Sequence, residues 1–359
     1  MDGATPGEAV MERLPRAVVA DDSHFMRSVI SDILEAGNIE VVAGARTGRE
    51  AVAAVHEHHP DVVTMDVEMP DMDGIEAVDR IMTEEPTPIL MLSAYTEEDA
   101  DVTFEALEAG AVDFFGKPGG EVSMEMSRFE DQLVEMVTNV ACVDPTGATP
   151  TPDDGGAAGG TPSYPASPTL VIGSSTGGPK MVETLLTELP LGADLRVLVV
   201  QHMPDGFTGR FAERIDARSD YDVREASDGD QIEAGEALIA QGGKHLEVVD
   251  YDDGRLEVLL TEDPPVNSVR PAVDVTMESA AREVSDPLIG VILSGMGEDG
   301  AAGIEAIKAV GGRTLAQDRS SSAVFGMPKR AIETGCVDEV LSINELPQGI
   351  ANTASAEVN

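Results

Sequence analysis

Polar side chains that could carry out chemistry follow short apolar runs at several points in the first part of the sequence. Asp21 and Asp22 follow "RAVVA", Asp66 closes "VVTMD", Ser93 closes "ILMLS" and Lys117 follows "FFG". Carboxylates brought together repel one another unless a hard divalent cation such as Mg²⁺ accompanies them. A nearby hydroxyl and a lysine could hold the oxygens of a phosphoryl group placed on one carboxylate. Each residue alone would be explained as a solvated turn residue, but the whole series favours a site.

A second group of reactive residue types lies in the later part of the chain. Ser175 stands in the glycine-rich stretch "VIGSSTGGPK", His202 follows "RVLVVQ", and Asp299 lies in "LSGMGEDG". If the preceding runs are adjacent parallel strands, a serine, a base and an orienting carboxylate meet at one rim. Simpler explanations remain for each: Ser174 or Thr176 could be a helix N-cap, and Asp299 a turn residue. The stretch could also bind phosphate, although it lacks the Lys-Ser/Thr end of a P-loop.

The apolar runs alternate with amphipathic stretches such as "HFMRSVISDILEAG" and "GREAVAAVHEHH". This alternation predicts parallel sheets that are covered by helices on both faces. In such sheets, functional residues collect at the carboxyl ends of the strands. We therefore predict an α/β fold with two doubly wound parallel-sheet domains, whose strand ends carry the two groups of residues.

Composition divides the chain into two halves. The segment "DPTGATPTPDDGGAAGGTPSYPASP" consists almost entirely of Pro, Gly, Ser, Thr, Ala and Asp, so it cannot bury a core. We predict a first domain over 15–140, a flexible linker over 141–168 and a second domain over 169–350. The residues after 350 are expected to form a loose tail.

The charge of the chain excludes several classes of function. The sequence has 67 acidic and 23 basic side chains, which give a formal net charge of −44 at pH 7. Such a surface repels nucleic acid and anionic membranes, so we expect neither nucleic-acid binding nor direct membrane insertion. Self-repulsion at this charge destabilises the compact state unless counterions screen it, which predicts a halophilic source.

The remaining bulk features predict a cytoplasmic protein. Cys142 and Cys336 are too few for a disulfide framework and have no metal-ligand spacing. No apolar run approaches the roughly 18 residues of a membrane span, and the acidic N-terminus lacks a signal-peptide pattern.

The first half resembles the response-regulator receiver domains, because "DDS", "MDVEMPDMDG", the serine of "LSA" and "KP" occur in that order. The resemblance implies a flavodoxin-like domain in which Asp66 accepts phosphate from a chemotaxis histidine kinase. Ser93 and Lys117 would contact the phosphoryl group, and Phe114 would be the aromatic switch residue. The groups implied to hold Mg²⁺ are the carboxylates of Asp21, Asp22 and Asp66 and a backbone carbonyl near Glu68.

The second half resembles the chemotaxis protein-glutamate methylesterases. The matching motifs are "IGSSTGGP", "VQHMP", "RPAVDVTMESAA", "LSGMGEDGAAG" and "AQDRSSSAVFGMPKRAI". The resemblance implies a Rossmann-like domain in which Ser175 is the nucleophile, His202 the general base and Asp299 its orienting carboxylate. It also implies that Thr176 helps to position the histidine and that the backbone N–H of Met296 contributes to an oxyanion hole. The choice of Ser175 over Ser174 rests on the family pattern, because spacing alone does not decide it.

Together, the two resemblances imply a phosphorylation-regulated carboxylic ester hydrolase of chemotactic adaptation, from a halophilic archaeon. The substrates would be glutamyl methyl esters on methyl-accepting chemoreceptors, with methanol as a product and deamidation of specific glutamines as a second activity. Mg²⁺ is expected in the receiver and no cofactor in the esterase. Two alternatives remain: a response regulator whose second half binds a phosphorylated ligand at "GSSTGG" without chemistry, and a non-catalytic interaction scaffold.

Overall fold

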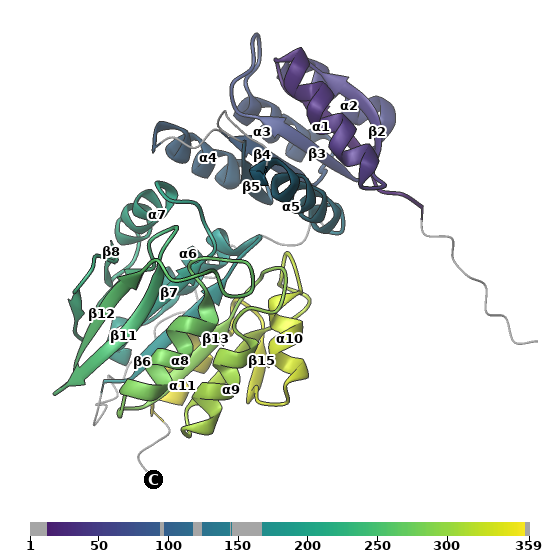
Figure 1. Cartoon of the computed structure of the whole chain (residues 1–359). Helices are drawn as coiled ribbons and strands as arrows, with labels where there is room; N and C mark the ends of the chain where they lie inside the picture. The colour runs from purple at the N-terminus through teal and green to yellow at the C-terminus, as the bar shows by residue number, and fades with distance from the viewer. Residues whose placement is uncertain (1–12, 94–96, 118–123, 144, 146–166, 356–359) are drawn as a thin grey trace, which may run out of the picture.

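The computed structural model describes residues 13–93, 97–117, 124–143, 145 and 167–355. Two α/β domains are stacked on one another, and helix α4 (Glu97–Ala109) of the first domain lies against α7 (Phe207–Asp216) of the second (Figure 1). Most of the predicted linker lies outside the described residues. In the described part of the chain, no helix combines the length and the apolar character needed to cross a membrane.

The first domain is built on a five-stranded parallel sheet with the order β2-β1-β3-β4-β5, which is the flavodoxin-like order. Its strands are β1 (Arg16–Ala20), β2 (Glu40–Ala45), β3 (Val62–Asp66), β4 (Ile89–Ser93) and β5 (Asp113–Gly116). Its helices are α1 (His24–Ala36), α2 (Gly48–His58), α3 (Gly74–Glu84), α4 (Glu97–Ala109) and α5 (Met124–Val140).

Local sequence explains where the elements of the first domain begin and which faces they bury. Ser23, Thr47 and Asp73 precede α1, α2 and α3, and each side chain accepts a hydrogen bond from an N–H of the first turn. The strands β3 and β4 are buried at every position, as expected for a sheet covered on both faces. One core contains side chains of α1 and α5, and the other contains side chains of α2, α3 and α4.

The second domain contains a seven-stranded parallel sheet with the order β15-β14-β13-β6-β7-β10-β8. Its strands are β6 (Thr169–Ser174), β7 (Arg196–Gln201), β8 (Asp222–Glu225), β10 (Glu236–Ile239), β13 (Leu288–Ile292), β14 (Arg313–Gln317) and β15 (Glu339–Leu341). Its helices are α6 (Gly178–Glu188), the 3₁₀ helix η1 (Leu191–Ala193), α7 (Phe207–Asp216), α8 (Val273–Glu283), α9 (Ala301–Ala309), α10 (Met327–Glu333) and α11 (Leu346–Ser355).

Helices cover both faces of this sheet, so the prediction of two doubly wound α/β domains is confirmed. One core contains side chains of α6, α7 and α11, and the other contains side chains of α8, α9 and α10. The strand β6 lies between β7 and β13, where the chain reverses the direction in which it adds strands. Such a switch point leaves a crevice at the carboxyl ends of the strands, and this crevice is where the second group of polar residues lies.

Two features of the second domain differ from the sequence-based expectation. An additional antiparallel sheet is formed by β9 (Gln231–Ile232), β11 (His245–Asp252) and β12 (Arg255–Thr261). The residues after 350 were expected to be a loose tail, but α11 continues to Ser355. The reason is burial: Leu346, Ile350 and Ala351 lie on one face of the helix and are at most 7% exposed.

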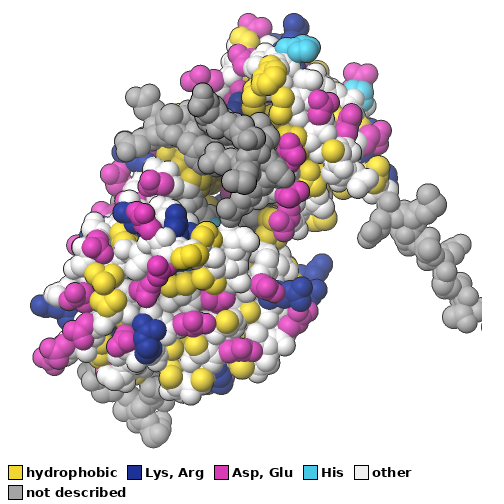
Figure 2. All heavy atoms as spheres, viewed as in Figure 1, with side chains coloured by type: hydrophobic (Ala, Val, Ile, Leu, Met, Phe, Trp, Pro, Cys, Tyr) yellow, Lys and Arg dark blue, Asp and Glu magenta, His cyan; other side chains and the backbone are white. Residues whose placement is uncertain are grey.

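Acidic side chains are spread over the visible face of both domains, with far fewer basic ones between them (Figure 2). This distribution is that of a chain with a formal net charge of −44. On this face, the negative charge is therefore spread over both domains and is not gathered in a single patch.

Candidate active site and receiver site

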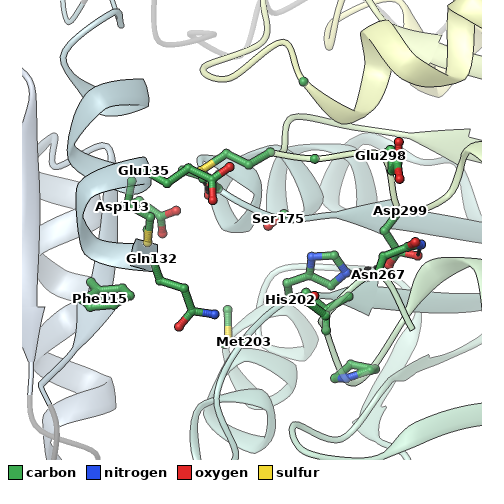
Figure 3. A pocket seen from close by; sticks show the side chains of 18 of the residues that line it. Asp113, Phe115, Gln132, Glu135, Ser175, His202, Met203, Asn267, Glu298 and Asp299 are labelled. Atoms are coloured by element: carbon green, nitrogen blue, oxygen red, sulfur yellow. Dashed lines mark hydrogen bonds and ion pairs between the residues drawn. The ribbon is translucent and has the colours of Figure 1, made fainter. Parts of the chain in front are cut away.

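The sharp turn after β6 separates the two adjacent serines. Ser174 is the last residue of the strand, is fully buried, and its Oγ donates to the carbonyl of Ser294 at 3.1 Å. Ser175 follows and lines a pocket (Figure 3). Gly178 makes the turn possible, because a Cβ at this position would lie 2.1 Å from the Oγ of Ser174. Of the two serines, Ser175 is thus the one that a substrate could reach.

The neighbouring strands bring the predicted base and carboxylate to the same rim. His202 follows β7, and Asp299 lies in the loop between β13 and α9. The Nε2 of His202 is 2.8 Å from the Oδ2 of Asp299. Figure 3 shows the imidazole between Ser175 and Asp299. No hydrogen bond joins Ser175 to His202 in the described part of the chain. In enzymes without bound substrate, the hydrogen bond between nucleophile and base is often long and tightens only when substrate binds.

The carboxylate of Asp299 is only 2% exposed and is surrounded by hydrogen-bond donors. Besides His202, it accepts from the N–H of Val273 at 2.6 Å, the N–H of Asp274 at 3.2 Å and the Nδ2 of Asn267 at 2.9 Å. Burial alone would raise the pKa of Asp299, but His202 and the other donors outweigh it and lower the pKa below its usual range. Asp299 is therefore a stable anion beside the imidazole.

Thr176 and Met296 lie at the same pocket but contact each other. The Oγ1 of Thr176 donates to the Sδ of Met296 at 3.2 Å, so this hydroxyl has a different partner from the histidine expected for it. The N–H of Met296 donates to no backbone carbonyl among the described residues. The oxyanion role of Met296 and the positioning role of Thr176 stay predictions.

The N-terminus of α6, which could have been a phosphate cradle, is capped by the first domain. Gly177 is the N-cap residue, with a φ of 69°, and its N–H donates to the Oδ2 of Asp113 at 3.0 Å. Asp113 begins β5 and is 5% exposed. Burial raises the pKa of Asp113 to about 7, although the N–H groups of Phe114 and Gly177 lower it. The sequence showed Asp113 only as part of a strand, with no sign of this contact.

The acidic residues predicted in the first domain also converge. Carboxylate oxygens of Asp21, Asp22 and Asp66 lie within 4.8 Å of one another. The Nζ of Lys117 is 2.8 Å from Asp21 and 2.7 Å from Asp66. Burial raises the pKa of Asp66 to about 6, although Lys117 lowers it. Three carboxylates beside the ammonium group of Lys117 leave negative charge unbalanced, and their oxygens are the donors that a divalent metal such as Mg²⁺ prefers.

The other predicted residues of the receiver lie around this cluster. Glu68 and Asp22 line one pocket of about 390 Å³ beside it. Ser93 is buried, and its Oγ accepts a hydrogen bond from Thr103 of α4 at 2.9 Å. Phe114 is 7% exposed and turned toward the second domain. The roles of all these residues stay predictions.

Aromatic rings join the two domains. Phe114 stacks on Phe207 of α7 with ring centroids 4.8 Å apart, and Phe104 of α4 stacks on Phe211 of α7 at 5.8 Å. Phe104 also meets Phe207 edge-on at 6.4 Å. These rings belong to one buried cluster that continues from the receiver core into the second domain. The centre of the contact is therefore apolar and buried.

Ion pairs surround the aromatic contact. Glu108 at the end of α4 accepts from Arg214 of α7 and from Arg218, which follows α7, both at 2.5 Å. Glu183 of α6 binds the same two arginines from within the second domain. These side chains are more exposed than the rings and form the polar rim of the interface.

A pocket of about 1020 Å³ lies between the domains and contains the reactive rim, which is formed by Ser175, His202 and Asp299. Ser175, His202 and Asp299 line it from one side (Figure 3). The receiver side chains that line it from the other side include Phe115, Gln132 and Glu135. In this arrangement, the first domain stands over the opening of the site.

Comparison with known proteins gives the family. The family model described as CheB methylesterase matches residues 170–350, and that of the response regulator receiver domain matches residues 17–126. The chain belongs to the CheB methylesterase family. The predicted family and the prediction of a methylesterase hydrolase with a receiver domain are confirmed.

Individual relatives agree with the family models. A protein-glutamate methylesterase/protein-glutamine glutaminase of Haloarcula marismortui is 64% identical over 96% of this chain and 98% of the relative. A protein of the same description from Natronomonas pharaonis is 58% identical over 95% of this chain and 98% of the relative. The predicted relation to proteins of halophilic archaea is thus confirmed.

A solved structure matches the second domain. The Thermotoga maritima CheB methylesterase catalytic domain is 40% identical, with a TM-score of 0.50 over 52% of this chain and 98% of that chain. This similarity supports the fold of the domain that carries Ser175, His202 and Asp299.

Proposed function

We propose that this member of the CheB methylesterase family is a phosphorylation-regulated serine esterase of chemotactic adaptation. Its substrates would be glutamyl methyl esters on methyl-accepting chemoreceptors, with deamidation of specific glutamines as a second activity. The observation that carries this proposal is the hydrogen bond between His202 and Asp299 beside the accessible Ser175. We place the enzyme in the cytoplasm, where a receptor's signalling helices and a kinase would meet it.

Hydrolysis would begin at the side of the imidazole that faces away from Asp299. When Nε2 of His202 donates to Asp299, the neutral ring has its lone pair on Nδ1, which can accept the proton of Ser175. The Oγ attacks the ester carbonyl, and the N–H of Met296 is available to stabilise the developing oxyanion. The imidazolium then gives its proton to the leaving methoxide, which departs as methanol, and water hydrolyses the acyl-enzyme with His202 as base.

In the receiver, Asp66 would accept the phosphoryl group from a chemotaxis histidine kinase. Asp21, Asp22, Asp66 and the carbonyl near Glu68 would hold Mg²⁺, which neutralises phosphoryl oxygens when bound. The ammonium group of Lys117 already lies against Asp66 and Asp21, so it is placed to contact the new phosphoryl group. Burial alone would lower the pKa of Lys117, but its hydrogen bonds to the two carboxylates raise it, so the side chain stays charged.

Phosphorylation would control access to Ser175 through the domain interface. Phe114 lies three residues before Lys117 and stacks directly on Phe207. A change at the phosphorylated site that moved Ser93 or Phe114 would disturb this stacking. The receiver would then leave the pocket mouth and admit a receptor helix.

The catalytic part of the proposal is tested by methanol release from methylated receptor membranes. Wild type should release methanol, whereas His202→Ala should lose most of the activity, by about 10³-fold or more. Unchanged methanol release by His202→Ala would contradict the proposed base and favour a binding or scaffold function.

The regulatory part is tested by comparing the unphosphorylated whole chain with a fragment that begins near Thr169. The fragment lacks the receiver that stands over the pocket, so it should hydrolyse the esters faster. Equal rates for the fragment and the whole chain would count against control by the receiver.

A further inference from the structure

The helices α8 and α9, which lie beside the reactive rim, are each capped at the N-terminus by a carboxylate from the other's end. Neither α8 nor α9 is capped by the side chain of its own N-cap residue. Asp299, which precedes α9, accepts hydrogen bonds from the N–H groups of Val273 and Asp274 at the start of α8. In return, the Oδ1 of Asp274 accepts from the N–H of Gly300 at 2.9 Å and of Gly303 at 2.7 Å. Each carboxylate thus satisfies the free N–H groups of the other helix.

One amide bridges the two carboxylates. The Nδ2 of Asn267 donates to the Oδ1 of Asp299 at 2.9 Å and to the Oδ2 of Asp274 at 2.7 Å. Asn267 has a φ of 50°, a left-handed conformation that asparagine tolerates better than most residues. The amide is therefore delivered from the loop before α8 into the space between two buried acids, where its N–H groups offset their repulsion.

We propose that Asn267 and Asp274 are positioning residues for the hydrolysis. This inference rests on the proposed roles of Ser175, His202 and Asp299. The Oδ1 of Asp299 accepts from Asn267 and the N–H of Asp274. Its Oδ2, held by the N–H of Val273, is thereby presented to His202. Asp274 anchors the first turn of α9, which begins directly after this loop, so the carboxylate keeps its place when substrate enters.

The electrostatics of the pair favour the same division of roles. Asp274 is 6% exposed, and its burial, followed by the charge of Asp299, raises its pKa. The pKa of Asp299 is lowered instead, because it faces the imidazole and more donors. Two neighbouring carboxyl groups whose pKa values are pushed apart take different roles. Asp299 is the one that remains charged toward His202.

Two nearly isosteric substitutions test the inference through opposite shifts in pH dependence. Asn267→Asp places an extra negative charge beside Asp299, which favours the protonated imidazole, so the acidic limb of the kcat/KM profile should move to higher pH. Asp274→Asn removes a carboxyl group, so the limb should move to lower pH. With the full-length chain on methylated receptor membranes, kcat should fall about 100-fold for Asn267→Asp and about tenfold for Asp274→Asn. KM should change by less than about twofold in both.

A matched control separates positioning from simple loss of stability. Asp338 accepts from the N–H of Thr314 in the same domain but does not touch the reactive rim. Asp338→Asn should lower the thermal midpoint without shifting the pH profile. If Asn267→Asp does not fold, Asn267→Ala removes the same donor from an exposed loop, with kcat expected to fall about tenfold at an unchanged KM.

The outcomes distinguish this inference from the proposed triad. Retained methanol release by Ser175→Ala and His202→Ala would overturn the triad itself. If those two variants lose activity while Asn267→Asp and Asp274→Asn keep wild-type kcat and pH profiles, only the positioning inference is wrong. The positioning inference would also be wrong if kcat fell only in proportion to a lowered thermal midpoint, as expected for Asp338→Asn.

Discussion

The two strand-end sites occupy the same topological position in their domains but hold their negative charge in different ways. Around Asp66, three carboxylates crowd together and the ammonium group of Lys117 opposes two of them. Around Asp299, the charge is balanced by an imidazole, an amide and two backbone N–H groups. In the proposed function, the first site is completed by a cation and a phosphoryl group, through which it would report a signal. In the second, Asp299 and His202 are already held by hydrogen bonds, so the proposed control would act on access to Ser175.

The largest expected effects separate the two chemistries. Ser175→Ala should lower methanol release by about 10⁴-fold or more, because it removes the nucleophile, while Asp66 should still accept phosphate. Asp66→Asn should do the reverse: it should take up no phosphate and keep the resting rate of hydrolysis. Methanol release and phosphate incorporation, measured on both variants, check this. Loss of both activities in either variant would show that the two sites are not separable.

The next effect tests whether access is controlled by the aromatic contact. Phe104→Ala removes the receiver ring that meets Phe207 and Phe211 but leaves the second domain intact. Loss of these ring contacts should weaken docking by about 2 kcal/mol and raise the rate of the unphosphorylated chain by about 30-fold. The measurement is the resting rate of methanol release.

A second buried phenylalanine provides the control for that experiment. Phe129 of α5 packs against Phe115 and belongs to the opposite core of the receiver. Phe129→Ala should destabilise the receiver without removing a ring from the contact with α7. Equal activation by Phe129→Ala and Phe104→Ala would mean that receiver unfolding, and not a specific contact, releases the enzyme.

The sequence predicted the two sites better than the contact between them. Strand ends drew attention to Asp66, to the two serines at the end of β6, and to His202, because parallel strands bring successive carboxyl ends to one edge. The choice of Ser175 over the preceding serine came from the family resemblance and not from spacing. The contact depends instead on which residues of two separately folded units meet, and no local pattern encodes that. The sequence predicts only that Asp113 lies in a strand. Its hydrogen bond from the N–H of Gly177 forms because the receiver packs on the second domain.

The same limit explains other misses. Asn267 stands in a polar loop, and its side chain matters only because two distant helices bring their carboxylates to it. The extension of α11 to Ser355 was missed because the final segment is rich in small polar residues. Burial of Ala351 against the domain, which is a tertiary effect, decides that the helix continues.

A smaller effect is expected from the buried carboxyl group at the domain contact. In the docked structure, burial raises the pKa of Asp113 to about 7, although the N–H groups of Phe114 and Gly177 lower it. We expect this pKa to return toward the usual carboxyl value when undocking exposes the side chain. The docked state therefore binds more protons than the open state. Docking is fully favoured below the usual carboxyl pKa and weakens as the pH rises to about 7.

This sign gives a measurable pH dependence. We compare the unphosphorylated whole chain with the fragment that begins near Thr169, because their rate ratio cancels the pH dependence of the chemistry itself. From about pH 6 to about pH 8, the ratio of whole-chain to fragment rate should rise by up to about tenfold. Asp113→Asn keeps an acceptor for the N–H of Gly177 but cannot ionise, so its ratio should stay flat. A rise in Asp113→Asn equal to that of wild type would assign the dependence to another group.

The smallest effect concerns the ion pairs at the rim of the interface. Glu108→Gln removes the charge that meets Arg214 and Arg218, and partly exposed pairs of this kind contribute about 0.5 kcal/mol or less each. The resting rate should therefore rise by less than about fivefold in dilute buffer.

Salt screens exposed charges but does not weaken apolar contacts, so the difference between Glu108→Gln and wild type should vanish at molar salt. The activation by Phe104→Ala should persist there. If salt abolished the Phe104→Ala effect instead, docking would depend on charge, and the aromatic contact would be secondary.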